Sequence, residues 1–169
     1  MTNQVRLGII GLGQQGGMYA SLINDGRVPH MTIGAICDID PAKRELARTT
    51  YPGVPVYDDL DALLASGDVD AVVTTTPHYL HPEMGIAALR AGLHVLVDKP
   101  AGVYTKQAQE LVDFAATRPE LTFAIMFNQR MNPLYRALKE IVDGGEIGAI
   151  RRSTWTITTW WRPQGYYDS

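Results

Sequence analysis

Short apolar segments alternate with helix-like segments along most of this chain, and no other feature limits its possible folds as strongly. Each apolar segment has the length and composition of a buried strand, and each leads into a turn or helix signal. These segments are Val5–Ile10, Met31–Asp38, Val54–Tyr57, Ala71–Thr76, Leu93–Val97 and Leu121–Phe127. Strands that are apolar throughout are buried on both faces, as they are in parallel sheets. The pattern therefore predicts an α/β fold with a doubly wound, mostly parallel sheet and helices on both faces.

The end of the chain departs from this alternation. Gly148–Trp161 predicts one long strand that carries tryptophans, and only Arg162–Ser169 follow it. Because a strand needs a sheet to pair with, we expect this segment to be the first strand of a second α/β domain that is incomplete here. The expected domains are residues 1–128 and residues 129–169. An edge strand added to the first sheet, or a strand exchanged with another copy, is the alternative.

Charge and cysteine content exclude several classes of protein. The chain has 15 Lys and Arg against 18 Asp and Glu, which argues against nucleic-acid phosphates as its main partner. The single cysteine, Cys37, allows no internal disulfide and favours a reducing compartment. The sequence shows no signal-peptide pattern and no apolar run near the roughly 20 residues that a bilayer needs. We therefore expect a cytoplasmic protein that binds neither nucleic acid nor a membrane.

A glycine-rich segment, Gly11-Leu12-Gly13-Gln14-Gln15-Gly16, directly follows the first strand and opens a helix. This is the context that a dinucleotide-binding G-x-G-x-x-G motif requires. Gly11 permits the tight turn, Gly13 lets a pyrophosphate approach the backbone, and Gly16 lets the helix pack close to the strand. The pyrophosphate would bind free amides at the positive end of the helix. We therefore expect these residues to bind the cofactor of a Rossmann domain; a strand–helix turn without a ligand is the alternative.

Asp38 ends the second strand, at the position where an acidic side chain bonds the ribose hydroxyls of an adenosine. Its charge would repel a 2′-phosphate, so NAD(H) is favoured over NADP(H). The nearby Lys43 and Arg44 leave NADP(H) open. Asp40 precedes Pro41 and is expected to cap the next helix, a role that Asp38 could share.

Polar residues also lie at and after the end of the fourth apolar segment, at the edge where ligands of open α/β sheets bind. The expected cofactor contacts in this segment are Thr75, Thr76, Pro77, His78 and His81. The two histidines lack a third ligand of suitable spacing, so no metal site is expected.

The fifth apolar segment ends in Asp98-Lys99-Pro100. A lysine at this edge can hydrogen-bond a reacting hydroxyl or carbonyl and, when partly desolvated, can exchange a proton. An ordinary salt bridge at the end of the strand is the alternative.

Together these motifs resemble the glucose–fructose oxidoreductase and inositol dehydrogenase family (Gfo/Idh/MocA). The resemblance rests on the glycine motif, Asp38, Thr76-Pro77 with His81, the run Gly92–Pro100, and Asn132-Pro133 followed by Gly145–Gly148. It implies an N-terminal Rossmann domain for NAD(H) or NADP(H) and a C-terminal substrate domain that often mediates oligomers. It also implies hydride transfer at a hydroxyl carbon of a sugar, cyclitol or similar polyol, so we expect a sugar-like substrate and a homo-oligomer.

The resemblance further assigns roles to individual residues. Lys99 takes the position of the family's catalytic lysine, next to cofactor and substrate. Asp98 stands where the family has glutamate and is also an expected cofactor contact. His81 matches the family's histidine near the nicotinamide, and the peptide bond before Pro100 is expected to be cis.

One part of the family pattern is not found in these residues. The family's general base is expected beyond residue 169, and His78 is a weak substitute for it. Arg162 is the expected contact to a polyol substrate. This chain alone is therefore expected to be inactive, and a non-catalytic NAD-binding sensor or assembly module is the alternative function.

Overall fold

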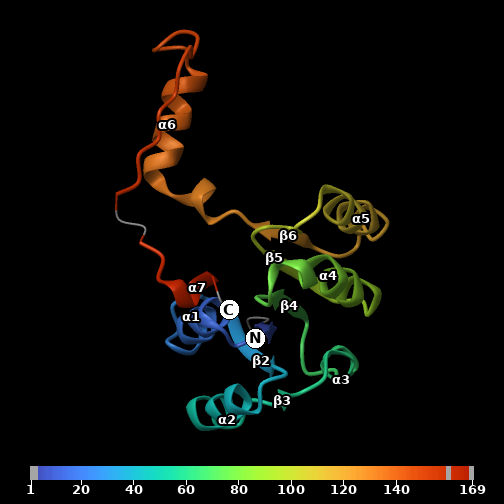
Figure 1. Ribbon diagram of the computed structural model, residues 1–169. Helices are drawn as coiled ribbons and strands as arrows, with labels where there is room; N and C mark the ends of the chain where they lie inside the picture. Colours follow the sequence, from blue (N-terminus) through green and yellow to red (C-terminus); the bar gives the residue numbers. More distant parts are fainter. Residues whose placement is uncertain (1–3, 159–160, 168–169) are drawn as a thin grey trace. The chain divides into compact units, whose positions relative to one another are not determined.

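The sheet of this protein is parallel throughout in the computed structural model, which describes residues 4–158 and 161–167. Its strands are β1 (Val5–Ile10), β2 (Met31–Cys37), β3 (Val56–Tyr57), β4 (Ala71–Thr74), β5 (His94–Asp98) and β6 (Phe123–Met126). Their order across the sheet is β3-β2-β1-β4-β5-β6 (Figure 1). The chain reverses its direction of travel across the sheet between β3 and β4, so the switch point of this doubly wound fold lies between β1 and β4. The predicted α/β sheet is confirmed.

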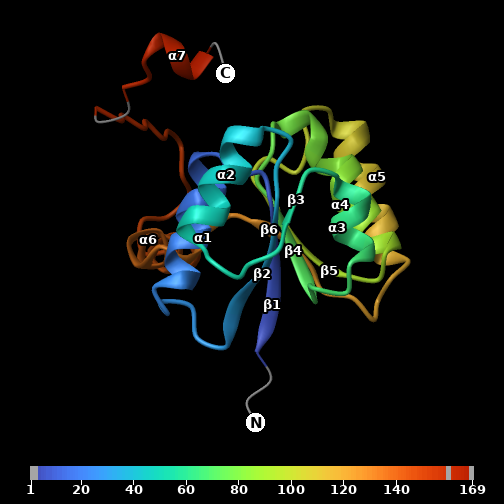
Figure 2. The same ribbon diagram turned by 90° about the horizontal axis from the view of Figure 1, so that it is seen from below.

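Helices cover the sheet from both sides (Figure 2). On one side lie α1 (Gln14–Asn24) and α2 (Pro41–Thr50), and on the other lie α3 (Leu60–Ala65), α4 (His81–Arg90) and α5 (Thr105–Ala116). A 3-10 turn, η1 (His78–Leu80), leads into α4. Each of these five helices lies in a crossover between two parallel strands, which places it on a face of the sheet. None of the helices within the described ranges has the length and apolarity needed to cross a bilayer.

Aspartates determine where α2 and α3 begin. Asp40 Oδ1 accepts a hydrogen bond from the Ala42 amide at 2.8 Å, and Pro41 takes the first helical position. Asp59 Oδ1 accepts from the Ala62 amide, also at 2.8 Å. These side chains satisfy amides that lack a partner in the first turn of a helix. The predicted cap at Asp40 is confirmed.

The apolar strand residues are buried on both faces of the sheet, as the pattern predicts. Ile9, Ile36 and Val73 are fully buried in the cluster under α1 and α2. Val72 and Val97 belong to the cluster under α3, α4 and α5. Because β1 to β5 contribute residues to both clusters, these strands are held in place from both sides, and their carboxyl ends have defined positions.

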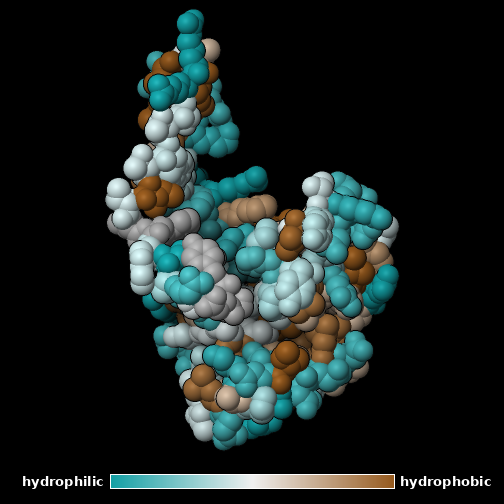
Figure 3. All heavy atoms as spheres, viewed as in Figure 1, coloured by the Kyte–Doolittle hydropathy of each residue, from teal (hydrophilic) through white to brown (hydrophobic). Residues whose placement is uncertain are grey.

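One part of the sheet is less covered. Within residues 4–127, a groove of about 370 Å³ lies between α1 and the strands β1, β4, β5 and β6, with Leu96 and Met126 among its apolar lining. The faces of parallel sheets are usually covered by helices. The part of the sheet that lines this groove therefore presents an apolar surface. Over the rest of this part, the face seen in Figure 3 is mainly polar, with separate apolar patches.

The backbone divides into two compact units between Phe127 and Asn128. The helical segments of the second unit are η2 (Asn128–Met131), α6 (Pro133–Asp143) and α7 (Gln164–Tyr167). Asn132 caps α6, because its Oδ1 accepts a hydrogen bond from the Leu134 amide at 2.9 Å.

The strand predicted for Gly148–Trp161 is wrong for the residues described. Residues 148–158 contain neither helix nor strand, while Thr159 and Trp160 lie outside the described residues. A strand is stabilised by hydrogen bonds to a neighbouring strand, and no segment in the described ranges pairs with this one. Trp155 instead packs against Tyr135 of α6, with ring centroids 5.5 Å apart. Side-chain alternation alone therefore did not make this segment a strand.

Candidate functional site

The candidate site forms at the carboxyl edge of the sheet, where the ends of β1, β2, β4 and β5 meet. The first unit alone brings together the glycine loop, Asp38, the Thr75–Pro77 segment and Asp98-Lys99. In open α/β folds, ligands bind at this edge beside the switch point. The folded sheet thus gathers sequence motifs that are far apart along the chain.

The three glycines of the loop have three different surroundings. Gly11 has φ +92, and a Cβ there would lie 3.0 Å from the side chain of Thr76. A Cβ on Gly16 would lie 2.0 Å from the carbonyl oxygen of Gly11. A Cβ on Gly13 would meet no atom within 4 Å. Gly11 and Gly16 are therefore required by the turn and by packing, whereas Gly13 faces open space.

The start of α1 has the properties of an anion-binding site. Gly13 is the N-cap residue and makes no capping bond with a side chain. The first amides of a helix lack partners within the helix and lie at its positive end. Because the space beside Gly13 is open, a phosphate group can approach these amides. The loop around Gln14 and Gln15 therefore fits the pyrophosphate of a dinucleotide.

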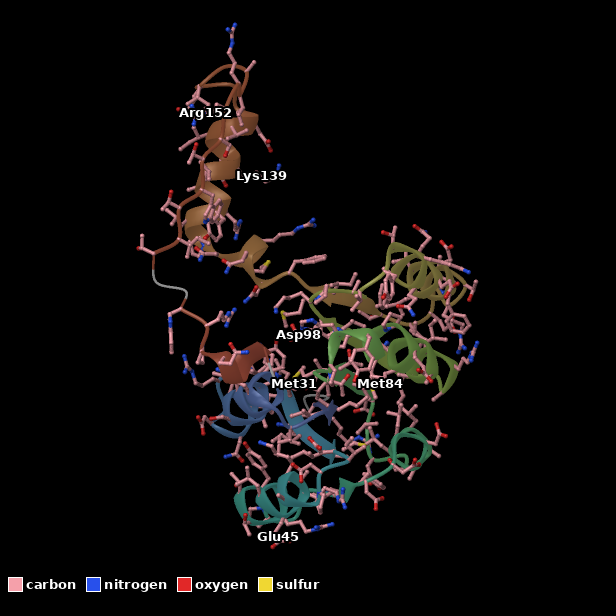
Figure 4. All side chains as sticks on the ribbon, viewed as in Figure 1. Met31, Glu45, Met84, Asp98, Lys139 and Arg152 are labelled. Atoms are coloured by element: carbon pink, nitrogen blue, oxygen red, sulfur yellow. The ribbon has the colours of Figure 1, made fainter. Side chains whose placement is uncertain are left out.

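Thr75 fastens the glycine loop to the end of β4. Its amide donates to the carbonyl oxygen of Ile10 at 2.8 Å. Its hydroxyl lies 2.6 Å from the carbonyl oxygen of Gly11 and 3.0 Å from that of Ile10. The neighbouring Thr76 hydroxyl lies 3.3 Å from the sulfur of Met84, which Figure 4 labels on α4. Thr75 thus holds the glycine loop in place, whereas the Thr76 hydroxyl contacts α4.

Asp38 connects the end of β2 to the same loop. Its Oδ2 accepts a hydrogen bond from the Leu12 amide at 2.7 Å, and its Oδ1 accepts from the Asp40 amide at 2.9 Å. A carboxylate can accept about four hydrogen bonds, so both oxygens keep capacity for ribose hydroxyls. Asp40 caps α2, which separates the two roles that the sequence left open. The side chain of Arg44 is anchored nearby, because its Nη1 donates to the carbonyl oxygens of Asp38 and Ile39 at 2.9 and 2.8 Å.

Asp98, the last residue of β5, and Lys99, which follows it, lie in different environments. Asp98, labelled in Figure 4, is 6% exposed, and its Oδ1 accepts a hydrogen bond from the Lys99 amide at 2.9 Å. The Lys99 residue is exposed, and the bond between Lys99 and Pro100 is cis, as predicted. Across residues 4–158 and 161–167, no carboxylate oxygen lies within 4.0 Å of the Lys99 ammonium. The alternative of a simple salt bridge therefore finds no support.

Tyr19 is a neighbour of this site that the sequence did not reveal. Its hydroxyl lies 3.5 Å from Asp98 Oδ1. Burial raises the pKa of Tyr19, and the charge of Asp98 adds to this shift. Helical spacing with Gly16 and Ile23 could have placed Tyr19 on the sheet side of α1. Its contact with the end of β5, however, is a tertiary one.

The two histidines of the predicted site differ in exposure. His78 lies at the surface; burial, followed by the charges of His81 and Lys99, lowers its pKa. His81 is 1% exposed, and both of its ring nitrogens contact backbone carbonyl oxygens. The structure therefore places Pro77 and His78 at the open edge and His81 beneath it.

Two further expectations concern Arg162 and a metal site. Arg162 is exposed and belongs to the second unit, so its predicted substrate contact stays a prediction. In the described ranges, no group of three or more His, Cys, Asp or Glu is arranged to hold a metal ion.

The fold and this edge define a class of protein. A parallel sheet of order 3-2-1-4-5-6, a glycine loop that opens α1, and an acidic residue after β2 are the features of a dinucleotide-binding Rossmann domain. The Gfo/Idh/MocA family, described as "Oxidoreductase family, NAD-binding Rossmann fold", matches residues 5–125. The chain belongs to this oxidoreductase family.

Individual relatives agree with this assignment. The chain is 33% identical to an uncharacterized oxidoreductase, YrbE, of Bacillus subtilis, over 88% of this chain and 42% of that protein. It is similar to a scyllo-inositol dehydrogenase from Lactobacillus casei, solved with NAD(H) and scyllo-inositol, with a TM-score of 0.80 and 30% identity over 86% of this chain and 42% of the other. It is also similar to the WlbA dehydrogenase from Bordetella pertussis, solved with NADH and UDP-GlcNAcA. The TM-score is 0.84, with 26% identity over 98% of this chain and 49% of the other.

These comparisons bear on the two functions that the sequence left open. The chain spans less than half the length of the curated relatives it matches. Both solved relatives are dehydrogenases that hold a nicotinamide dinucleotide together with a polyol or a nucleotide sugar. The comparisons therefore favour the oxidoreductase, and nothing in them favours the sensor or assembly module.

Proposed function

We propose that this chain is the cofactor-binding part of an NAD-dependent oxidoreductase that transfers hydride at a hydroxyl carbon of a sugar, cyclitol or similar polyol. The observation that carries the proposal is the position of Lys99. It is an exposed lysine with no carboxylate within 4.0 Å in the described ranges, at the same edge as the uncapped start of α1. A free ammonium there is available to a substrate oxygen.

The residues of this edge fit a dinucleotide from end to end. The amides of Gly13 to Gly16 would bind the pyrophosphate, and Asp38 would accept hydrogen bonds from the adenosine ribose. Thr76, Pro77 and His78 line the edge between that end and Lys99. When bound, the dinucleotide supplies the hydride chemistry, and the protein supplies placement and electrostatics.

Lys99 would act on the substrate oxygen. As a hydrogen-bond donor it would stabilise the negative charge that develops on this oxygen when the hydroxyl carbon loses hydride. A base outside these residues would take the hydroxyl proton. Asp98 would hold the backbone of Lys99 in place, because its carboxylate accepts from the Lys99 amide and is buried.

The preference for NAD(H) over NADP(H) rests on the charges around Asp38. Its carboxylate would repel a 2′-phosphate at the ribose that it binds. Arg44 offers less compensation than its charge suggests, because its Nη1 already donates to two backbone carbonyl oxygens.

We also propose the wider setting of this site. Residues 1–128 would form the cofactor domain and residues 129–169 the start of a substrate domain, which agrees with the division at Phe127 and with the greater length of the relatives. The apolar groove beside β6 supports a homo-oligomer. The buried free thiol of Cys37 supports a cytoplasmic location.

A calorimetric titration of the 169-residue chain with NADH and with NADPH tests the proposal. We expect NADH to bind with micromolar affinity, and NADPH to bind at least about tenfold more weakly, a difference of about 1.4 kcal/mol. A folded chain that binds neither would overturn the cofactor site. Equal or tighter binding of NADPH would overturn the role given to Asp38 while leaving the site itself intact.

A further inference from the structure

His81 connects two turns of the candidate site from below. It is the first residue of α4 and is 1% exposed. Its Nδ1 lies 2.8 Å from the carbonyl oxygen of Pro100, and its Nε2 lies 2.9 Å from the carbonyl oxygen of Thr76. The ring therefore spans the turn after β5 and the turn after β4. In this position the ring has no free nitrogen to offer to a cofactor.

The chemistry of these two contacts restricts the state of the ring. A carbonyl oxygen only accepts hydrogen bonds, whereas a neutral imidazole carries a single N–H. A neutral His81 would therefore direct one nitrogen lone pair at a carbonyl oxygen less than 3 Å away. An imidazolium ring donates to both oxygens, and hydrogen bonds from a charged donor are about twice as strong as neutral ones.

The charged groups around this ring come from neighbouring elements. The ring of His78 in η1 lies 5.7 Å from that of His81, centroid to centroid. The pKa of His78 is lowered first by burial and then by the charges of His81 and Lys99, while Asp98 at the end of β5 raises it. The Asp98 carboxylate is therefore a negative charge that acts on His78, beside the ring of His81.

We propose that His81 is a positioning residue that holds the Lys99–Pro100 turn against the Thr76–Pro77 turn by donating from both ring nitrogens. This inference rests on the proposed function, because these turns carry the lysine and the expected cofactor contacts. The bond to Pro100 restrains the residue next to Lys99. The bond to Thr76 restrains the residue next to Thr75, whose hydroxyl contacts the glycine loop. One buried ring thereby couples the position of the lysine to that of the loop.

Such coupling matters for hydride transfer, because the lysine, the substrate and the cofactor must be positioned accurately relative to one another. A misplacement of about 1 Å can lower a rate by about a hundredfold. Lys99 is exposed and makes no ion pair within the described ranges that would hold its side chain. Its position therefore depends on the backbone of the turn, which Asp98 holds at one end and His81 at the other.

The protonation of His81 can be tested without a variant or a ligand. Nitrogen-15 NMR of histidine-labelled chain at neutral pH should show a hydrogen on both ring nitrogens of His81, and the exposed His30 provides an internal reference signal. A single protonated nitrogen on His81 would overturn the proposal. Since no NADH is present, this result is independent of whether the cofactor site is correct.

The positioning role is tested with His81→Leu and a matched control, His94→Leu. His94 also bonds the backbone, since its Nδ1 accepts from the Thr122 amide at 2.9 Å, but it lies at the start of β5, at the opposite edge. Lysines labelled with carbon-13 methyl groups report their surroundings by NMR. We expect the Lys99 signal to shift in His81→Leu and to stay in place in His94→Leu.

The outcomes separate positioning from simple stabilisation. Unchanged Lys99 signals in a folded His81→Leu variant would overturn the proposal, even if the variant melts at a lower temperature. If His81→Leu does not fold, the nitrogen-15 measurement on the unaltered chain decides. NADH titration of the unaltered chain, run in parallel, shows separately whether the proposed function itself fails.

Discussion

Gly13 and Gly16 belong to one loop, yet substitution by alanine should have a different effect at each position. A Cβ on Gly13 meets no atom within 4 Å, and the backbone there has φ -75, which any residue adopts. A Cβ on Gly16 would lie 2.0 Å from the carbonyl oxygen of Gly11 and 2.6 Å from the hydroxyl oxygen of Thr75. The first substitution should therefore affect binding, and the second should affect folding.

The magnitudes follow from these distances. Ordinary Cβ contacts begin at 3.4 Å, so Gly16→Ala forces α1 and the loop apart by more than an ångström. Overpacking of this kind costs about 1–3 kcal/mol, which lowers the Tm of a chain this size by roughly 2–12 °C. Gly13→Ala replaces one N-cap residue with a poorer one, at a cost below about 1 kcal/mol. Its methyl group, however, would occupy the space proposed for the pyrophosphate.

The loss of binding can be estimated in the same way. A hydrogen bond to a charged group contributes about 1.5–3 kcal/mol, so losing one such bond weakens NADH binding by roughly 10- to 150-fold. Thermal unfolding and NADH calorimetry on both variants measure the two effects separately. NADH binding to Gly13→Ala at the unaltered affinity would refute the pyrophosphate position. A Gly16→Ala variant that melts like the unaltered chain would refute the close packing of α1.

Three further predictions concern other residues of the first unit. Asp38→Asn should bring the affinities for NADH and NADPH closer together by about tenfold, measured by the same calorimetry; an unchanged ratio would contradict the ribose assignment. Lys99→Met should leave NADH binding within about threefold but, in the longer protein, should lower turnover by about a hundredfold or more; full turnover would exclude a catalytic lysine. Burial raises the pKa of the Cys37 thiol from 9.0 to about 11. The unfolded thiol therefore ionises first, and stability should be unaffected below about pH 9 and fall as pH rises toward 11. Urea unfolding across this range should show a steeper fall for the unaltered chain than for Cys37→Ala, and equal slopes would contradict the shift.

Much of the fold could be predicted because its signals are local. Six apolar segments, the capping Asp40 and the glycine loop after β1 each depend on a few neighbouring residues, and the structure contains all of them. The segment at 148–158 shows the limit of such signals. Its alternation is typical of a strand, but a strand also needs a partner, and the described residues provide none.

In the site, too, local features could be predicted and contacts between distant residues could not. Gly11, Gly13 and Gly16 could be assigned separate roles from their spacing, because a glycine turn between a strand and a helix has few solutions. The hydrogen bond from the Leu12 amide to Asp38 and the contact between Tyr19 and Asp98 could not be predicted from the sequence. Each joins residues that are distant along the chain.

The sequence by itself determined the parallel α/β architecture, the position of the glycine loop and the polar motifs at the ends of the strands, since periodicity, capping and turn chemistry act over a few residues. Only the tertiary structure decided that His81 lies buried with both nitrogens on carbonyl oxygens while Lys99 remains exposed. The physical reason is that burial and hydrogen-bond partners depend on how α4 packs against the ends of β4 and β5. No local pattern in the chain encodes that packing.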